Sequence, residues 1–256
     1  MHPFLLKLDA NISQKKSFLC VGLDPDFELL AHRVAPTVDA TEAFLRDLID
    51  QTSEYAVAFK PNLSFFEAIG FEGLHMLQRV IRHIDPAIPV ILDAKRGDVG
   101  HSATKQAQYL FDTFNPDAIT VNPYMGGDCV NSFVAFKDKF HFILTLTSNP
   151  GANDFQKQML QNGQTLYESV AKRAQSWHQT HENVGLVVGA THAQMAHVRG
   201  LTDLVFLVPG VGEQGGGYQQ VLEQCLNSKQ LGVVSVSRQL MCSENFKQTC
   251  KLILGR

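Results

Sequence analysis

The sequence predicts a single α/β domain, a (β/α)8 TIM barrel that spans residues 1–256. Two observations predict this fold: eight short apolar runs alternate with longer amphipathic stretches, and the runs are almost continuously apolar. Parallel strands covered by helices on both faces have this continuous character, whereas half-exposed strands alternate. About 250 residues is also the usual length of such a barrel. A doubly wound open sheet has the same alternation of elements, so it stays open as the competing architecture.

The eight runs are predicted as strands because each is short and rich in aliphatic or β-branched residues. They cover residues 18–23, 55–60, 89–95, 117–123, 141–147, 184–190, 203–209 and 232–237. Stretches between the runs have apolar residues at helical spacing. The clearest of these cover residues 40–52, 73–84, 103–114, 164–177 and 218–227. This alternation of strand and helix is the order that a parallel barrel requires.

Polar residues follow most of these strands, at the end where barrel enzymes place their chemistry. They are Asp24 and Asp26 after the first strand, Lys60 and Asn62 after the second, Asp93, Lys95 and Asp98 at the third, Ser148 and Asn149 after the fifth, and Arg238 after the eighth. We therefore expect a functional site at the C-terminal end of the barrel. The long polar segment 148–161, which contains Gly and Pro, would be a lid over that site.

The third strand ends in a charged motif that contains Asp93, Lys95 and Asp98. Residues two apart on a strand share a face, so Asp93 and Lys95 are expected side by side. Carboxylates around a lysine keep it protonated and oriented as a proton donor. A structural salt bridge, with Asp98 as the N-cap of the next helix, is the alternative. Asp24 and Lys60, at the ends of neighbouring strands, favour the catalytic interpretation.

A glycine-rich loop, residues 209–217, lies between the seventh strand and a helix. It satisfies the spacing G-x-G-x-x-G, but that dinucleotide fingerprint normally opens a first βαβ unit, and Arg238 ends the next strand where an acidic residue is expected. Barrels often hold a phosphate between the loops after strands 7 and 8. Backbone N–H groups and a guanidinium both favour an anion. The loop and Arg238 therefore predict a phosphate site, with a flexible surface turn as the alternative.

The composition excludes several classes of protein. A formal net charge of −3, with 18% charged residues, argues against a general nucleic-acid or membrane-surface role. The five cysteines are odd in number and contain no C-x-x-C pair, which predicts reduced thiols. The first residues lack the pattern of a signal peptide, and no apolar run is long enough to span a membrane. We therefore expect a cytoplasmic protein.

Five motifs, VGLDPD, DAKRGD, SNPGA, PGVGEQGG and SR, occur in this order along the chain. Together they resemble the orotidine 5′-phosphate decarboxylase family, and the resemblance covers nearly the whole chain. LDAKRGDVG, FKPNLSFFEAIGFEGL and VNPYMGGD look like its longer bacterial branch, often called type 2. The resemblance implies a (β/α)8 barrel that works as a homodimer without metal or organic cofactor. It also implies conversion of orotidine 5′-phosphate (OMP) to UMP, the last step of de novo pyrimidine biosynthesis.

The resemblance further implies roles for individual residues. Lys95 would protonate C6 of the pyrimidine, and Asp93 would lie beside the substrate carboxylate. Asp98 would reach in from the partner subunit and complete a charge array with Lys60. The implied substrate contacts are Asp24 and Lys60 at the ribose, Ser102 at a ribose hydroxyl across the dimer interface, Ser148 at the pyrimidine edge, Pro209 beside the substrate, and Gln214 and Arg238 at the phosphate. Ser237 and Glu213 depart from the residues that many relatives have, which affects the phosphate loop.

Other functions on the same barrel remain open. A metal-dependent sugar-phosphate decarboxylase or aldolase is the nearest, since related barrels share D-x-K-x-x-D. It would need a further acidic ligand, and His192 and His197 lack a paired acidic motif. Schiff-base chemistry at Lys95 is disfavoured by the flanking carboxylates. A non-catalytic nucleotide sensor would need no catalytic group, yet the sequence retains all of them.

Overall fold

A nearly closed parallel barrel forms the centre of the computed structural model, which describes residues 1–189, 192–210 and 217–256. Its eight strands have the order β2-β1-β8-β7-β6-β5-β4-β3. Parallel bridges from Phe59 to Val90 and from Asn62 to Asp93 join the edges β2 and β3. The predicted (β/α)8 barrel is confirmed, and the doubly wound open sheet is wrong because its edges would stay apart. The strands are β1 Leu19–Leu23, β2 Ala58–Pro61, β3 Ile91–Arg96, β4 Ala118–Val121, β5 Phe140–Leu146, β6 Val184–Val188, β7 Phe206–Val208 and β8 Val233–Val236.

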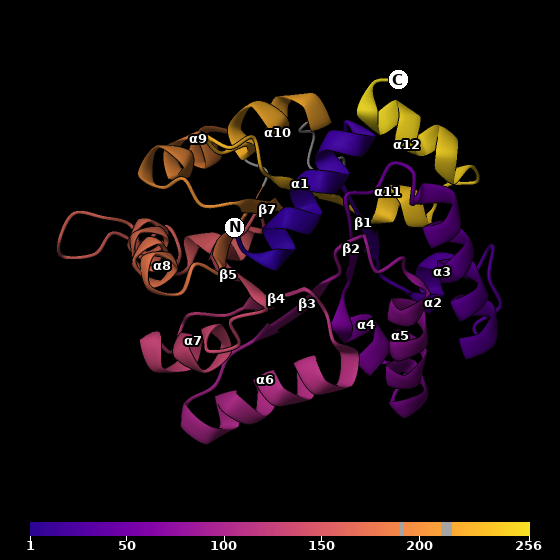
Figure 1. The fold of residues 1–256 in the computed structure, drawn as a ribbon, viewed down its shortest axis with the longest axis horizontal. Coiled ribbons are helices and arrows are strands. Elements are labelled where there is room, and N and C mark those ends of the chain that lie inside the picture. Colours follow the sequence, from indigo (N-terminus) through magenta and orange to yellow (C-terminus); the bar gives the residue numbers. More distant parts are fainter. Residues whose placement is uncertain (190–191, 211–216) are drawn as a thin grey trace.

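Helices surround the strands, as Figure 1 shows. They are α1 Pro3–Lys15, α2 Phe27–Leu30, α3 Val38–Thr52, α4 Leu63–Glu67, α5 Phe71–His83, α6 Gly100–Phe114, α7 Gly127–Val134, α8 Leu166–His181, α9 His192–Leu201, α10 Tyr218–Cys225, α11 Arg238–Met241 and α12 Phe246–Leu254. The five predicted helical stretches are confirmed as α3, α5, α6, α8 and α10. Side chains define where several begin; Thr165 and Glu168, for example, form a reciprocal capping box at α8.

Two apolar clusters hold the barrel together. One fills the barrel interior with side chains such as Cys20 of β1 and Phe142 of β5, and the other packs the outer strand faces against the helices. Phe4, Leu8 and Ile12 of α1 belong to the interior cluster, and the Phe4 ring stacks on Phe140 at 4.8 Å. Helix α1, which the sequence did not predict, therefore closes the N-terminal end of the barrel. The C-terminal ends of the strands are left as the open mouth.

The strand boundaries differ from the predicted ones by up to three residues. Residues 55–57, for example, were expected in a strand that starts at Ala58 in the structure. Tyr55, Ala56 and Val57 are nevertheless buried, so apolar character extends beyond the paired backbone. The end of the predicted strand 184–190 lies outside the described residues. Among the helices of the described ranges, none combines the length and the apolar character that crossing a membrane requires.

A buried histidine on β5 makes stability depend on pH. His141 has no exposed surface, its ring contacts Phe111 edge-on, and its Nε2 has no hydrogen-bond partner among the described residues. Burial lowers the pKa of His141 to about 3. Between about pH 6.5, the value of an unfolded histidine, and pH 3 the unfolded chain therefore binds a proton that the folded chain does not. This group makes stability fall as the pH falls through that window.

We expect His141→Gln to reduce this acid sensitivity. One proton corresponds to about 1.4 kcal/mol per pH unit, so the loss of unfolding free energy between pH 6.5 and pH 5 should shrink by about 2 kcal/mol in the variant. Urea unfolding at the two pH values measures it. His75→Gln, which changes an exposed imidazole on α5, is the control. Equal acid losses in wild type and His141→Gln would contradict the assignment.

Candidate active site

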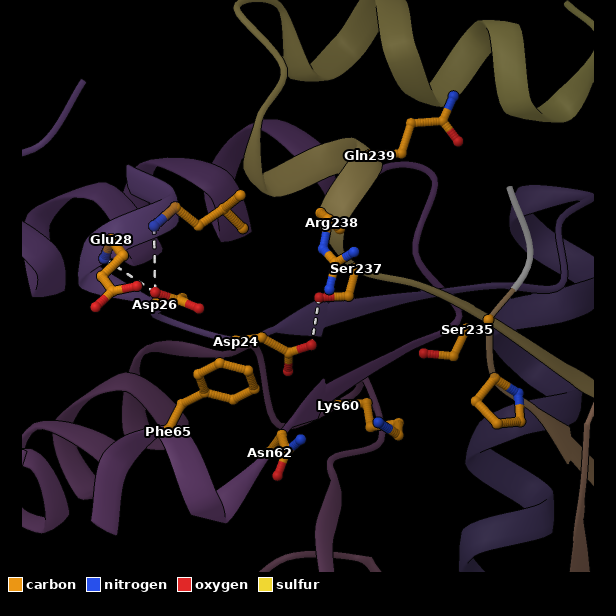
Figure 2. A pocket seen from close by; sticks show the side chains of 13 residues that line it. Asp24, Asp26, Glu28, Lys60, Asn62, Phe65, Ser235, Ser237, Arg238 and Gln239 are labelled. Atoms are coloured by element: carbon orange, nitrogen blue, oxygen red, sulfur yellow. Dashed lines mark hydrogen bonds between the residues drawn. The ribbon is translucent and has the colours of Figure 1, made fainter. Parts of the chain in front are cut away.

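Two adjoining cavities open at the C-terminal ends of the strands. The larger, about 560 Å³, is lined by residues that include Asp24, Lys60, Asn62, Pro209, Ser237 and Arg238 (Figure 2). The smaller, about 230 Å³, is lined by residues that include Asp93, Lys95, Thr120 and Ser148, and it shares Lys60 and Pro209 with the larger one. The predicted location of the site, at the strand ends, therefore coincides with a real cavity.

One carboxylate holds two ammonium groups where the cavities meet. Asp93 Oδ2 lies 2.6 Å from Lys60 Nζ, and Asp93 Oδ1 lies 2.7 Å from Lys95 Nζ. Asp93 and Lys60 are buried, whereas the Lys95 side chain is 48% exposed. Burial alone would raise the pKa of Asp93, but the two ammonium groups outweigh it and hold that pKa well below its usual range. Burial opposes the charge on Lys60 too, yet Asp93 and Asp24 raise the pKa of Lys60 above its usual value. The three groups form a charged array inside the protein.

Asp93 and Lys95 meet for a different reason than the sequence predicted. The alternation rule assumes a regular strand, but the β3–β4 register shifts between Leu92 and Arg96, and Lys95 has φ 46°. This left-handed conformation costs a non-glycine residue about 1–2 kcal/mol. Such strain persists only where surrounding contacts impose it, and it is concentrated at functional sites. A bulge therefore directs the Lys95 side chain.

Thr120 on β4 is the site residue that sequence reasoning missed. It is buried; its hydroxyl donates to Asp93 Oδ1 at 2.8 Å and accepts from the Lys95 backbone N–H at 2.9 Å. In the sequence it is one more residue of an apolar strand, and a threonine is common there. Only its position opposite the bulge of β3 distinguishes Thr120 from an ordinary strand threonine.

Asp24, just after the end of β1, lines the larger cavity together with Lys60 of this array. Its Oδ2 accepts a hydrogen bond from the Ser237 hydroxyl at 2.5 Å, whereas its buried Oδ1 has no partner among the described residues (Figure 2). Burial raises the pKa of Asp24, and Lys60 partly offsets this. The Ser237 side chain reaches Asp24 because Gly22 leaves room; a Cβ there would lie 2.5 Å from the Ser237 Cβ. Ser237, which differs from the residue that many relatives have, is thus accommodated by the neighbouring Gly22, and the Ser237 hydroxyl fixes one oxygen of Asp24.

Asp98 and Ser102 do not enter the cavity of their own chain. The Asp98 carboxylate accepts hydrogen bonds from the Val99 N–H and, at 3.4 Å, from the Gln106 amide, and it forms no ion pair with Lys95 within the described chain. The N-cap alternative for Asp98 is wrong, because α6 starts at Gly100 with Val99 as the N-cap and without a side-chain cap. Ser102 lines a separate, open depression. Within the described chain, neither residue is part of the lining of the two cavities.

The remaining predicted substrate contacts are only partly within the described chain. Ser148 and Pro209 line the smaller cavity, and Arg238 lines the larger one as the first residue of α11. Residues 211–216 of the glycine-rich loop, which include Gln214, lie outside the described residues. In the predicted lid, a short 3-10 helix, Pro150–Asn153, is followed by Gln156, which hydrogen-bonds to Thr147. The segment is therefore structured at the mouth, and its function as a lid stays a prediction.

Two strand-end residues have structural functions instead. Asp26 caps α2 by accepting from the backbone N–H groups of Glu28 and Leu29, and Asn62 caps α4 in the same way through Ser64. Neither needs a substrate to explain its presence, although both line the larger cavity.

A metal centre finds little support in the geometry. Within residues 1–189, 192–210 and 217–256 there is no cluster of three or more histidine, cysteine, aspartate or glutamate residues suited to a metal ion. His197 does have an acidic partner, contrary to the sequence interpretation: its Nε2 lies 2.5 Å from Glu168 Oε1. That pair joins α9 to α8, and no third ligand of these types joins it among the described residues.

Comparison with known proteins decides the family. The model of the orotidine 5'-phosphate decarboxylase / HUMPS family matches residues 17–253. The chain belongs to this family. A curated orotidine 5'-phosphate decarboxylase from Roseiflexus sp. is 40% identical over 92% of this chain and 87% of its own length, and one from Flavobacterium johnsoniae is 43% identical over 87% and 83%. The solved Leishmania donovani OMP decarboxylase has a TM-score of 0.87 at 40% identity and covers 98% of this chain and 95% of its own. The predicted family and enzyme class are therefore confirmed.

Proposed function

We propose that this chain decarboxylates OMP to UMP, in the last step of de novo pyrimidine biosynthesis, without metal or organic cofactor. The observation that carries the proposal is the array in which Asp93 holds the ammonium groups of Lys60 and Lys95 at the meeting point of the two cavities. Membership of the decarboxylase family supports the choice of substrate. The cytoplasmic location and the absence of a cofactor stay predictions.

The reaction needs a proton donor at one carbon. When the C6–carboxylate bond breaks, CO2 leaves and the bonding electron pair stays on C6 of the pyrimidine. Lys95 Nζ donates one proton to that pair, which gives UMP, and the neutral amine then regains a proton from water. Asp93 lies beside the substrate carboxylate and repels it, and the same Asp93 keeps the Lys95 ammonium in position. The ion pairs with Asp93 also occupy the amines that Schiff-base chemistry would need free.

Repulsion alone is too small to account for the catalysis. Two unit charges about 4 Å apart interact by roughly 4 kcal/mol at an effective dielectric of about 20. The most proficient enzymes lower their barriers by roughly 20 kcal/mol. Most of the stabilisation must therefore come from the Lys95 ammonium near the developing charge, in an array that the protein's own ion pairs hold in place.

The larger cavity binds the ribose and the phosphate in this proposal. Asp24 Oδ1, which has no partner among the described residues, accepts a hydrogen bond from a ribose hydroxyl, and Lys60 also contacts the ribose. The Arg238 guanidinium binds the phosphate, and Gln214, which lies outside the described residues, is its proposed second ligand. Ser148 contacts the pyrimidine edge and Pro209 lies against the substrate. Binding energy from the remote phosphate then contributes to expelling water from the reacting end.

The active enzyme is a homodimer in which Asp98 and Ser102 complete the site of the partner subunit. The Asp98 carboxylate bonds to the Val99 N–H and the Gln106 amide and forms no ion pair with Lys95 within the described chain, which supports this arrangement. Exposed apolar side chains also lie on the loops after β3, β4 and β5, at the same end of the barrel: Val99, Tyr124, Met125 and Phe155. Tyr124 and Phe155 form a ring contact at 6.5 Å. An exposed apolar surface of this kind is typical of a protein interface.

The fall in orotidylate absorbance after addition of purified protein in EDTA tests the function. We expect full activity, because the proposed groups all belong to the protein. Loss of activity in EDTA that a divalent cation restores would indicate the metal-dependent decarboxylase or aldolase. Binding of UMP without any turnover of OMP would indicate a nucleotide sensor. Either result contradicts the proposal.

A further inference from the structure

The hydroxyl of Thr120 hydrogen-bonds to two residues of the array, Asp93 and Lys95, which lie in the irregular part of β3. Leu92 pairs with Ile119 and Arg96 pairs with Val121, so three residues of β3 lie opposite the single residue Thr120 of β4. In a regular ladder the Lys95 N–H would donate to a backbone carbonyl. Here it donates to Thr120 Oγ1 at 2.9 Å, and the same hydroxyl donates to Asp93 Oδ1 at 2.8 Å.

Both ends of the Lys95–Asp93 ion pair therefore depend on one atom. The hydroxyl fixes the Lys95 backbone in its left-handed conformation, with φ 46°, from which the side chain starts. It also fixes the Asp93 oxygen that receives Lys95 Nζ at 2.7 Å. Thr120 lines the smaller cavity, but its hydroxyl proton is already donated to Asp93.

We propose that Thr120 is a positioning residue that sets where the Lys95 ammonium lies relative to Asp93, through the hydrogen bonds of its hydroxyl to both residues. The inference rests on the proposed functions of Lys95 and Asp93. Displacement of a catalytic group by about 1 Å can cost about 100-fold in rate. The effect falls on kcat rather than on KM, because Asp24 and Arg238, the residues proposed to bind the ribose and the phosphate, line the larger cavity.

Thr120→Val and Thr120→Ser separate the effect of the hydroxyl on the rate from the effect of side-chain packing. Valine has the same shape without the hydroxyl, and serine keeps the hydroxyl without the methyl group. We expect Thr120→Val to lower kcat by about 10- to 100-fold with KM changed by less than about threefold, and Thr120→Ser to stay within about threefold of wild type in both. Thr145→Val is the matched control, since Thr145 on β5 is also buried and, within the described part of the chain, its hydroxyl bonds only to the Ile143 carbonyl. Its kcat should be unchanged.

Rescue by serine is a readout that a packing defect would not give, because serine keeps the hydroxyl that makes both hydrogen bonds and lacks the methyl group. Wild-type kcat in a folded Thr120→Val would overturn the inference. Equal losses in the valine and serine variants would also overturn it.

Lys95→Met in the same assay separates this inference from the proposed function. If Lys95→Met is inactive while Thr120→Val has wild-type kcat, the assignment of Thr120 is wrong and the proposed function stands. If Lys95→Met retains wild-type kcat, the proposed chemistry itself fails, and the positioning role fails with it.

Discussion

A mixture of two inactive variants, Asp98→Ala and Lys95→Met, is expected to recover about a quarter of wild-type activity after the subunits exchange. Each variant alone should be at least about 100-fold impaired, because each loses a charged group next to the reacting carbon. With random pairing about half of the dimers are mixed, and one of the two sites in each mixed dimer has native Lys95 and native Asp98. The purified mixed dimer, isolated with two different tags, should reach about half of wild-type activity.

The reason is that Asp98 makes its contacts outside the site of its own chain. Its carboxylate accepts hydrogen bonds from the Val99 N–H and the Gln106 amide on its own subunit, and among the described residues it is not part of the lining of either cavity. If Asp98 serves the adjacent subunit, the Lys95→Met subunit can supply a native Asp98 to the site of the Asp98→Ala subunit. If Asp98 served its own site, no mixed dimer would contain an intact site.

Lys60→Ala mixed with Lys95→Met is the matched control. Both lysines contact Asp93 of the same chain, so every site in that mixed dimer lacks one of them and no activity should return. If the Asp98→Ala and Lys95→Met mixture, with exchange verified, were also no more active than its parents, the shared site would be refuted.

The sequence predicts the architecture well because the architecture depends on repeated patterns. Continuous apolar strands such as Val184–Val188 are typical of a sheet with both faces buried, and the structure buries every residue of that strand, β6. The general location of the site follows from the same reasoning, since polar residues such as Asp24 and Lys60 interrupt the apolar pattern at the strand ends.

The details that the sequence does not predict depend on local breaks in those patterns. The alternation rule cannot detect the bulge at Lys95, because the preference for a left-handed residue there comes from contacts with the next strand. Thr120 is missed for the same reason. The pairing of Gly22 with Ser237 joins residues far apart in the chain, and neither is informative without the other.

Replacement of Lys95 by methionine is expected to lower the rate of UMP formation by at least about 10⁴-fold. A positioned general acid contributes about 10²- to 10⁴-fold, and removal of a charge that stabilises the transition state adds about 10²- to 10³-fold. Stability should change little, by about 1 kcal/mol or less, because the Lys95 side chain is 48% exposed and its ion pair is screened by solvent. Methionine has a similar length, so the cavity keeps its shape.

Two controls accompany this variant. Lys172→Met removes an exposed lysine on α8 and should leave the rate unchanged. Binding of UMP and the free energy of unfolding should both stay near wild type in Lys95→Met, which shows that the loss of rate is not a loss of structure.

The most direct test of the central claim, that the Lys95 ammonium held by Asp93 protonates the carbon that loses CO2, is a single-turnover measurement of UMP formation by folded Lys95→Met saturated with OMP. We predict a rate at least about 10⁴-fold below wild type with nucleotide binding retained. A folded variant that forms UMP at the wild-type rate would contradict it.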